Sequence, residues 1–442
     1  MATDKKNNVM FLTQRFYMAA TAVILTVAAG YLFAPLYTVG RIMLAALAVA
    51  LATETALLWS RKGMDARRKC AERFSNGDDN EVKLRVESSY PFEVRVDAVD
   101  EIPVVFQRRD ISFRLTVPAR GERVITYSLR PTKRGVYGFG MIRVFATTRI
   151  GLVQRRYSCG RAEDIKVYPS YLMLRRYELL AISNRLTDLG VKRIRRVGNN
   201  TEFEQIREYV KGDDSRTINW RATARRHQLM VNIYQDERSQ QVFTVIDKGR
   251  IMQQVSNGMT LLDYAINSSL MLSFVAMNKE DKAGLITFNE RFGSYTPASR
   301  RPGHMQQLLE CLYAQETSFG ESDYSALATG INRHVTKRSL LILYTNFSGK
   351  TDMERQLTYL RQINSRHRLL VVFFEDRELK EYIGTQPETT EDYYRHVIAE
   401  KFANEKRLIV SALKRNGIMS LLTTPENLSV DVINKYLEVK RI

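Results

Sequence analysis

Cysteine is scarce in this sequence, which has 3 cysteines in 442 residues. Cys70, Cys159 and Cys311 are odd in number, lie far apart, and have no metal-binding or redox spacing. This pattern excludes a disulfide framework and is typical of reduced thiols in a cytoplasmic compartment. The sequence also lacks a Gly-rich phosphate-binding loop, so no nucleotide-phosphate site of that kind is predicted.

Acidic residues are outnumbered, because 67 basic and 48 acidic residues give a formal net charge of +19. Such a charge fits attraction to anionic lipid headgroups, to nucleic acid or to an acidic protein partner. No stripe of basic and aromatic residues accompanies the charge, so we expect membrane lipids and no nucleic acid as its partner. The basic run Lys192, Arg193, Arg195 and Arg196 is interpreted as a solvated loop or a contact with anionic lipid.

The chain is too long for one compact core, and its size fits a membrane anchor with two soluble domains. Charged residues are absent from 16–40, and Glu54 is the only one in 42–60. Each run approaches the roughly 20 apolar residues that cross a bilayer. With Pro35 in the turn between them, the pattern predicts a helical hairpin of about residues 12–33 and 38–59 within an anchor of residues 1–62.

Basic residues flank both outer ends of this hairpin, so the positive-inside rule places both termini and the soluble body in the cytoplasm. A cleavable signal peptide is the alternative for the first segment. Glu54 is open to two interpretations. It marks a functional site inside the membrane, or it reaches the inner interface and pairs there with Arg61.

Residues 75–170 show the period-two alternation of antiparallel strands, as in 82–86, 92–96 and 124–129. Turn residues interrupt these runs, including the closely spaced glycines of 133–140. We therefore expect an immunoglobulin-like β-sandwich of about seven strands that serves as a spacer or docking module. Arg134 and Tyr137 are expected to brace its glycine-rich turn.

Residues 171–240 form a separate segment rich in alternating charges. Thr201 and Glu204 have the spacing of a capping box, which predicts a short helix that ends at Gly212. The charged residues would form an ion-pair network around Trp220 on two short helices. That network comprises Glu204, Arg207, Asp213, Arg216 and Arg225. It is open to two interpretations, structural bracing or a surface for partner recognition, because no nucleophile with a base and no metal-ligand cluster accompanies it.

In residues 241–442, strand patterns alternate with helix patterns. The pattern predicts four strands, with a helical pattern between successive strands, at 242–247, 283–289, 340–345 and 369–375. This order predicts a Rossmann-like α/β domain, a parallel sheet with helices on both faces. Ligands of such sheets bind outside the C-terminal strand ends, which here are residues 247–251 and 345–349.

The order Phe203-Glu204, Arg207, Tyr209, Gly212-Asp213, Arg216, Trp220 and Ala224-Arg225 resembles the signature of the domain-of-unknown-function family 58 (DUF58). Asn219 departs from it, since that family often has Asp there. The resemblance implies a bacterial inner-membrane protein with a von Willebrand factor A-like domain. It also implies association with a MoxR-type AAA+ ATPase that assembles or matures other complexes.

Von Willebrand factor A domains hold a divalent ion with an Asp-x-Ser-x-Ser loop, a Thr and a later Asp. Here the resemblance leaves Asp247 in place, with Gly249 and Ile251 at the serine positions and Asn346 at the late aspartate position. The middle loop offers 321–323, which includes Asp323. We therefore expect a degenerate site with no metal and no cofactor, in which Lys248 or Arg250 pairs with Asp247 or Asp323 in place of the ion.

These observations favour a non-enzymatic, membrane-anchored scaffold or adaptor that presents the strand-end loops to a protein partner. One alternative is an enzyme acting on cell-envelope material, with Glu204, Asp213 and Asp247 in acid–base roles. A metal-dependent adhesion protein is another.

Overall fold

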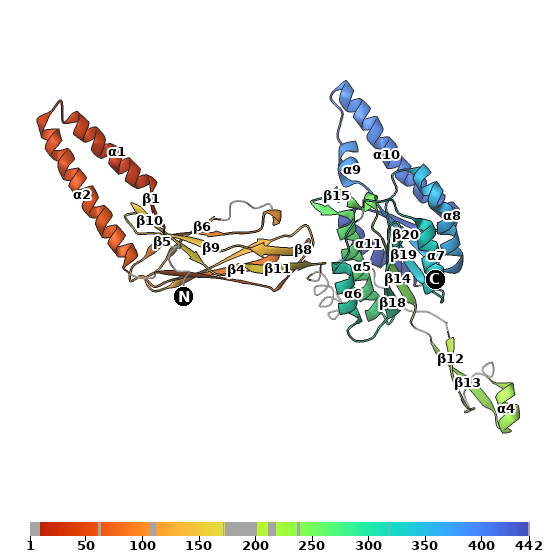
Figure 1. Cartoon of the computed structure of the whole chain (residues 1–442). Coiled ribbons are helices and arrows are strands. Elements are labelled where there is room, and N and C mark those ends of the chain that lie inside the picture. Colours follow the sequence, from red (N-terminus) through yellow and green to blue (C-terminus); the bar gives the residue numbers. More distant parts are fainter. Residues whose placement is uncertain are drawn as a thin grey trace. The chain divides into compact units, whose positions relative to one another are not determined.

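The computed structural model describes residues 9–60, 63–106, 112–170, 172, 201–210, 218–236, 239–317 and 319–440. The chain divides into two compact units, Met1–Tyr168 and Pro169–Ile442 (Figure 1). The first unit holds two apolar helices and a β-sandwich. The second holds a hairpin arm and a parallel sheet with helices on both faces.

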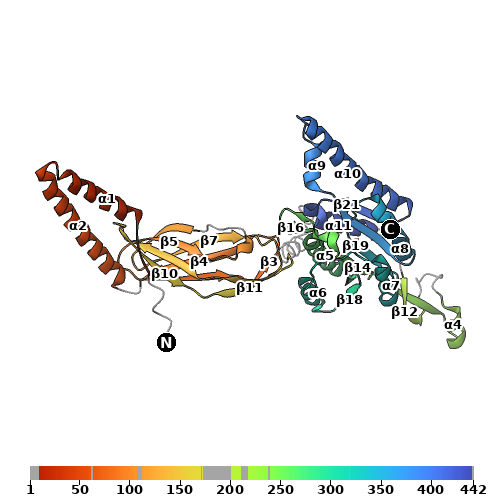
Figure 2. The same cartoon turned by 45° about the horizontal axis from the view of Figure 1, so that its top comes forward.

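The N-terminal helices α1 (Gln14–Ala29) and α2 (Ala34–Trp59) pack against each other as a hairpin (Figure 2). Pro35 lies in the first turn of α2 and not in the connecting turn as predicted, because that position needs no backbone N–H. A Cβ atom on Gly40 would lie 2.7 Å from Cγ2 of Val27, so glycine allows the close approach of the two helices.

Among the described residues, α2 is the one helix long and apolar enough to cross a membrane. Helix α1 has 16 residues, or about 24 Å at 1.5 Å per residue, which is short of a hydrocarbon core of about 30 Å. The structure therefore supports membrane association through α2, and the predicted two-span topology is not supported by helix length. Many large apolar side chains of the hairpin are exposed, including Ile24, Leu25, Tyr31, Leu32, Phe33, Ile42 and Val49.

Glu54 is fully buried, and both of its carboxylate oxygens accept hydrogen bonds from one loop of the sandwich. The Thr148 hydroxyl and the Gly151 N–H (3.0 Å) donate to Oε1. The backbone N–H groups of Leu152 (2.8 Å) and Val153 (3.2 Å) donate to Oε2. Glu54 thus fixes the end of α2 to the sandwich, a contact that the sequence did not predict, and both interpretations from the sequence stay predictions. Arg61 lies outside the described residues.

The sandwich contains more strands than the seven expected and begins before residue 75. Its five-stranded sheet has the order β1-β10-β9-β5-β6, with bounds Val9–Leu12, Val153–Cys159, Ile142–Thr147, Val94–Asp100 and Ser112–Val117. One three-stranded sheet is β2-β4-β7, with bounds Met64–Cys70, Asn80–Ser88 and Glu122–Leu129. The other is β3-β11-β8, with bounds Arg73–Ser75, Glu163–Tyr168 and Gly135–Phe139.

The predicted period-two pattern accounts for the core of the sandwich. In β4, Val82, Leu84 and Val86 are buried while the intervening side chains are exposed. As predicted, Tyr137 braces the glycine-rich turn, since its hydroxyl donates to the carbonyl oxygens of Lys133 (3.2 Å) and Arg134 (3.3 Å).

The arm consists of β12 (Thr201–Glu208) and β13 (Met230–Asp236), which pair antiparallel, and of α4 (Trp220–Arg226). The predicted helix at Thr201–Glu204 is wrong, because strand pairing with β13 overrides the local capping signal. Asn219 caps α4 by accepting from the Ala222 N–H (3.0 Å), and its amide donates to Asn232 Oδ1 (2.7 Å). An aspartate at this position would lack that donor.

The α/β sheet has the strand order β18-β17-β14-β19-β20-β21, and all neighbours are parallel except β18. In that order the bounds are Phe292–Ser299, Lys282–Phe288, Gln241–Asp247, Leu340–Tyr344, Arg368–Phe374 and Met419–Thr423. The short strands β15 (Val255–Ser256) and β16 (Met259–Thr260) pair separately.

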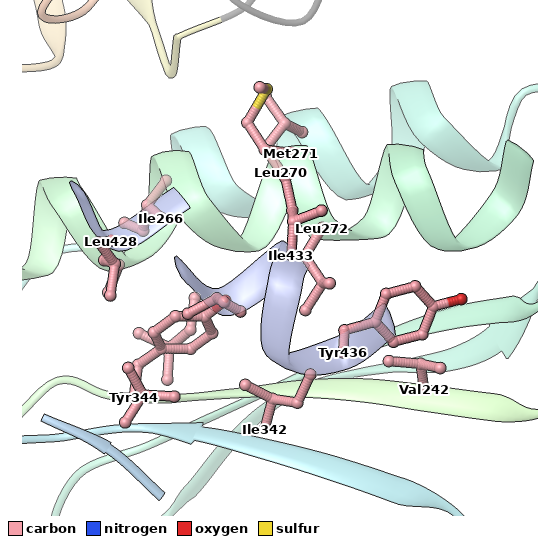
Figure 3. Packing of buried hydrophobic residues seen from close by; sticks show 14 of the residues in the cluster. Val242, Ile266, Leu270, Met271, Leu272, Ile342, Tyr344, Leu428, Ile433 and Tyr436 are labelled. Atoms are coloured by element: carbon pink, nitrogen blue, oxygen red, sulfur yellow. The ribbon is translucent and has the colours of Figure 1, made fainter. Parts of the chain in front are cut away.

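Helices cover both faces of this sheet, as the alternating pattern predicted. One face carries α5 (Leu261–Asn278), α6 (His304–Tyr313) and α11 (Leu428–Val439), whose side chains pack on Val242, Ile342 and Tyr344 (Figure 3). The other face carries α7 (Tyr324–His334), α8 (Lys350–Arg366) and α10 (Thr390–Arg415), and the short α9 (Arg377–Ile383) precedes α10. The connections diverge between β14 and β19, which places a crevice at their C-terminal ends.

We expect Glu54→Gln to destabilise the first unit by about 1–3 kcal/mol, because an amide N–H₂ group would then face backbone N–H donors. Thermal unfolding of the full chain in detergent, with amide hydrogen exchange of residues 148–153, measures the effect. Thr53→Ala is the control, since the Thr53 hydroxyl bonds only within its own helix. Unchanged unfolding and exchange in Glu54→Gln would show that the contact does not hold α2 in place.

A second prediction concerns pH. His367 is buried, and burial with the nearby Arg366 and Arg338 charges lowers its pKa. The folded state therefore resists protonation, and the stability from neutral His367 is present above the unfolded pKa of about 6.5 and lost as the pH falls below it.

Neither ring nitrogen of His367 has a hydrogen-bond partner among the described residues, so His367→Leu should flatten this acid-side loss without removing a hydrogen bond. Urea unfolding at about pH 7.5 and about pH 5.5 measures it. His227→Asn is the control, because His227 is exposed and has a positive φ that asparagine tolerates. Equal pH dependence in wild type and His367→Leu would contradict the prediction.

Candidate functional site

Asp247 is the last residue of the central strand β14, and its buried carboxylate is satisfied by the chain itself. Oδ1 accepts from the Gly249 N–H (2.8 Å) and from the Ser322 hydroxyl. Oδ2 accepts from Thr345 Oγ1 at 2.7 Å, and the Thr345 hydroxyl oxygen lies 2.7 Å from the Tyr324 hydroxyl. These groups come from three loops at the C-terminal edge of the sheet.

Burial dominates the electrostatics of this carboxyl group. Desolvation raises the pKa of Asp247, although the donors from Ser322, Thr345 and Gly249 oppose the shift. The same burial and the neighbouring Asp247 charge raise the pKa of the Tyr324 hydroxyl well above its usual value, so it stays protonated as a donor. The site therefore holds a charge that destabilises the folded state and that local hydrogen bonds only partly offset.

Gly249 is required by the approach of Ser322. A Cβ atom at position 249 would lie 2.1 Å from Ser322 Oγ and 3.1 Å from Asp247 Oδ1. A serine there, as in a metal-binding Asp-x-Ser-x-Ser loop, would force Ser322 away from the carboxylate. Position 251 is isoleucine, and among the described residues no group of three or more His, Cys, Asp or Glu side chains is placed to hold a metal ion. Because the loop after β14 lacks both hydroxyl groups of the metal-binding pattern, the site stays a predicted degenerate one.

Of the two cations expected to replace the ion, Arg250 does not pair with either predicted aspartate. Arg250 forms its ion pair with Glu321 (3.7 Å) on the exposed side of the loop and not with Asp247 or Asp323. Asp323 caps α7 by accepting from the Ser325 and Ala326 N–H groups. The Ser325 side chain, with these backbone donors, lowers the pKa of Asp323. The Lys248 N–H donates to the Phe288 carbonyl (2.8 Å), and burial lowers the pKa of the Lys248 amine.

The cation closest to the predicted late-aspartate position is Lys406, which sequence reasoning missed. Its Nζ donates to Asn346 Oδ1 (2.6 Å) and to the Phe347 carbonyl oxygen (2.6 Å), and lies 5.9 Å from the centre of the Phe373 ring. Burial lowers the pKa of Lys406 to about 8. Lys406 lies on α10, 60 residues after Asn346, and no local motif signals the contact.

A groove of about 780 Å³ opens beside Lys406. Its walls come from the loops after β14, β19 and β20 and from the two helices α9 and α10. The lining combines apolar side chains, among them Ile251, Phe347, Phe374, Leu379, Ile383 and Phe402, with charged ones, among them Arg250, Glu375, Asp376, Lys380, Glu405 and Lys406. This volume lies within the range of roughly 300–1,000 Å³ that ligand pockets occupy.

An apolar stripe on α10 continues from this groove. Tyr394, Ile398 and Phe402 follow each other at four-residue spacing, and their exposed fractions are 71%, 53% and 50%. Val397 on the same side of the helix is also exposed. Since Phe402 lines the groove as well, the groove and the stripe form one surface, here called the α10 surface.

The residues predicted to surround Trp220 belong to the arm. Trp220 is the first residue of α4 and is 69% exposed, and Arg225 is exposed in the last turn of that helix. Arg207 lies on β12 and donates to the Glu208 carbonyl (3.0 Å), while Glu204 lies at an irregularity of the same strand. Asp213 and Arg216 lie outside the described residues. The predicted pair of helices is replaced by a strand and one helix.

Asp247→Asn is expected to stabilise the fold by about 0.5–2 kcal/mol near neutral pH, because it removes a buried charge and keeps an acceptor for Gly249 and Ser322. Asp281→Asn is the contrasting variant. Asp281 is also fully buried, but it has an ion pair with Lys440 (2.7 Å), so its neutralisation should destabilise. Urea unfolding of the three proteins measures both signs.

Loss of stability in Asp247→Asn would mean that the charge itself is needed, as it would be for a bound cation. A titration of the same proteins with Mg²⁺ and Mn²⁺ is the second readout, and we expect no binding that depends on Asp247. Binding by the wild type that disappears in Asp247→Ala would refute the degenerate-site interpretation.

The resemblance to DUF58 is confirmed over part of the chain. Residues 205–385 match the family model described as "Protein of unknown function DUF58", which is less than half of the chain. "Uncharacterized protein YeaD" from Bacillus subtilis (strain 168) is 25% identical over 126 residues, which are 28% of this chain and only 31% of that relative's length.

Two solved structures are similar at lower identity. An aerotolerance-related membrane protein from Bacteroides fragilis NCTC 9343 is 14% identical with a TM-score of 0.28, and the match covers 46% of this chain and all of that one, 100%. The CARDB domain of a Pyrococcus furiosus protein, determined in complex with di-metal ions, is 13% identical with a TM-score of 0.17, covering 24% of this chain and 93% of that one. The similarity to DUF58 thus spans the arm and the α/β sheet as far as α9.

Proposed function

We propose that this chain is a non-enzymatic, membrane-anchored scaffold or adaptor whose α/β domain is of the von Willebrand factor A type. Its partner would be a MoxR-type AAA+ ATPase that assembles or matures other protein complexes. The observation that carries the proposal is the α10 surface, an open groove lined by apolar and charged side chains and continuous with an exposed apolar stripe on α10 at the C-terminal edge of the sheet. Exposed apolar patches of this kind mark sites of protein interaction.

The chemistry of the edge favours binding over catalysis. Asp247, the one acid retained from a metal-binding loop, has its oxygens occupied by donors of its own chain. A carboxylate in that state is poorly placed to hold a cation or to accept a proton from a substrate. Lys406 in turn donates to Asn346 and to the Phe347 backbone. The polar groups thus shape the edge, and the apolar ones remain available to a partner.

The anchor, which is proposed to enter the membrane through α2, has both of its outer ends at the sandwich. The start of α1 and the end of α2 both contact the same loop of the sandwich. Arg15 on α1 donates to the Ile150 carbonyl (3.1 Å), and Glu54 on α2 accepts from the Gly151 N–H. The far turn carries exposed Tyr31 and Phe33, aromatic residues suited to a membrane–water interface. With the basic residues at the near ends, this arrangement supports a cytoplasmic body close to the bacterial inner membrane.

Crosslinking of the intact protein in its native membranes, followed by mass spectrometry of the captured partners, tests the proposal. We expect an AAA+ ATPase among the captured proteins. The double variant Tyr394→Ser with Ile398→Ser should reduce its capture about tenfold, because two exposed apolar contacts are lost.

Val124→Ser is the matched control, since Val124 is also an exposed apolar residue but lies on β7 of the sandwich. Capture of envelope enzymes or of lipids without any ATPase would overturn the adaptor proposal. Equal loss of capture in Val124→Ser would show that the effect is not specific to the α10 surface.

A further inference from the structure

The parallel strands of the α/β sheet begin at one edge, which lies opposite to the edge with Asp247. Ala283, near the start of β17, pairs with Val242 of β14. Leu340, the first residue of β19, pairs with Arg368, the first residue of β20. Helices α5, α7, α8 and α10 each end just before a strand that begins at this edge. The N-terminal edge of the sheet therefore gathers short segments that are far apart in the sequence.

Basic residues are concentrated in the segments that meet at this edge. These segments are 279–282, 299–301, 333–338, 366–368, 414–417 and 438–440. They contain twelve bases and three acids, a formal net charge of +9, whereas the whole chain carries +19. We call the twelve bases the basic edge. They are Lys279, Lys282, Arg300, Arg301, Arg333, Lys337, Arg338, Arg366, Arg368, Lys414, Arg415 and Lys440.

Two of the three acids in these segments are already paired within the chain. Asp281 is fully buried, forms an ion pair with Lys440 (2.7 Å) and accepts from the Tyr436 hydroxyl. Glu438 forms an ion pair with Lys435 (2.9 Å). Most of the bases, in contrast, have no hydrogen-bond or ion-pair partner for their side chains among the described residues. These are Lys279, Lys282, Arg300, Arg301, Arg333, Lys337, Arg338, Lys414 and Arg415.

Helix dipoles explain only part of this pattern. Arg333, Arg366 and the pair 414–415 lie in the last turns of α7, α8 and α10, where a positive charge is favourable. Lys282 lies on β17 instead. The pair 300–301 precedes the start of α6, the end of a helix at which the dipole disfavours a cation. The excess of bases at this edge therefore needs a second explanation.

The opposite edge of the sheet has the opposite sign. Its segments are 247–251, 289–291, 315–323, 345–352, 374–378 and 423–427. They contain five bases and ten acids, a formal net charge of −5. The α/β domain is thus polarised along its strands, and near a negatively charged surface it would turn its basic edge toward that surface.

We propose that the basic edge lies against the anionic phospholipid headgroups of the bilayer that α2 enters. The C-terminal edge and the α10 surface would then face away from the membrane, where a soluble partner can reach them. The inference rests on the proposed membrane anchorage and adds the face that the α/β domain turns to the bilayer.

The composition and width of the edge favour a lipid surface over other anions. The six segments contain no aromatic residue, and their two valines, Val335 and Val439, are buried. Protein interfaces depend on aromatic anchors, and single-stranded nucleic acids stack on aromatic side chains. The bases also extend across six strands, about 24 Å at about 4.8 Å per strand, which is too wide for one free phosphate. A planar array of charges without apolar anchors matches a planar layer of headgroups.

Site-specific photo-crosslinking to lipid tests the orientation. The full chain is reconstituted into nanodiscs of phosphatidylcholine alone, or of phosphatidylcholine with about one quarter phosphatidylglycerol. The photoreactive residue p-benzoylphenylalanine replaces Thr336 at the basic edge or Ser348 at the opposite edge, both of which are exposed. We expect lipid adducts at position 336 to be about fivefold more abundant with phosphatidylglycerol, and adducts at position 348 to be rare in both. Raising NaCl from about 0.05 M to about 0.5 M should remove most of the adduct, because salt screens the attraction.

Charge reversal away from the probe shows whether the whole edge contributes. Arg300→Glu with Arg301→Glu should reduce the adduct at position 336 about fivefold, because the two bases belong to the same face. Arg355→Glu with Lys401→Glu is the matched control. It makes the same change in formal charge at exposed positions within α8 and α10, away from the helix ends, and should leave the adduct unchanged.

Several results would overturn the proposal. They are equal adducts at position 336 with and without phosphatidylglycerol, more adduct at position 348 than at 336, no adduct at either position, and an equal effect of the two charge reversals. Loss of the adduct when duplex DNA is added at equal phosphate concentration would assign the edge to nucleic acid instead. Thermal unfolding of each variant verifies that it is folded.

The orientation and the proposed function fail in different ways. A chain that does not co-purify with nanodiscs of phosphatidylcholine alone would overturn the membrane anchorage, since these discs carry no net charge. If the chain co-purifies and an AAA+ ATPase is captured but position 336 gives no adduct, the adaptor function stands and the orientation is wrong. If the adduct forms and no ATPase is captured, the orientation stands and the partner is wrong.

Discussion

Two buried carboxylates, each satisfied by hydroxyl and backbone N–H donors, hold the parts of this protein in place. Glu54 accepts from one sandwich loop and fixes the apolar helix α2 to the first unit. Asp247 accepts from Gly249, Ser322 and Thr345 and ties three loops together at the edge of the α/β sheet. In both places several oriented dipoles offset part of the cost of a buried negative charge, so the donors, and not a cation, decide how neighbouring elements meet.

Asp100, another buried acid, is paired with a cation. Asp100 in the sandwich accepts from the equally buried guanidinium of Arg68 (3.0 Å from Nε) and from the Tyr127 hydroxyl. This arrangement is a closed ion pair that leaves no charge for a ligand. At the sheet edge, acid and cation are instead kept apart, with Asp247 paired to hydroxyls and Lys406 to carbonyl oxygens. The carboxylates of Asp376, Asp352 and Glu405 also act on Lys406 and raise its pKa, against the larger effect of burial.

Local patterns in the sequence predicted the elements whose burial follows a simple period. The alternation at Val82–Val86 and the apolar run at Val242–Asp247 both became strands in the expected setting. The sequence did not predict the features that depend on contacts between residues far apart in the chain. Pairing between β12 and β13 overrides the capping box at Thr201. The donors to Glu54 lie 94 to 99 residues later in the chain, so no local pattern signals them. The Asp247 loop was located correctly, but its hydroxyl donors and Lys406 come from other loops that no local pattern connects.

The groove also shows how a shared scaffold acquires its own chemistry. The segment that matches DUF58 ends at residue 385 and supplies Asp247 and Asn346, the fixed polar groups of the sheet edge. Lys406 and Phe402 come from α10, which begins at Thr390 and packs on the sheet through Ile409 and Leu413. Because the inner half of α10 is anchored in the core, its outer half can differ in sequence without disturbing the sheet. The outer half of α10 thus projects from a helix whose position is set by the core, above an edge that Asp247 ties together.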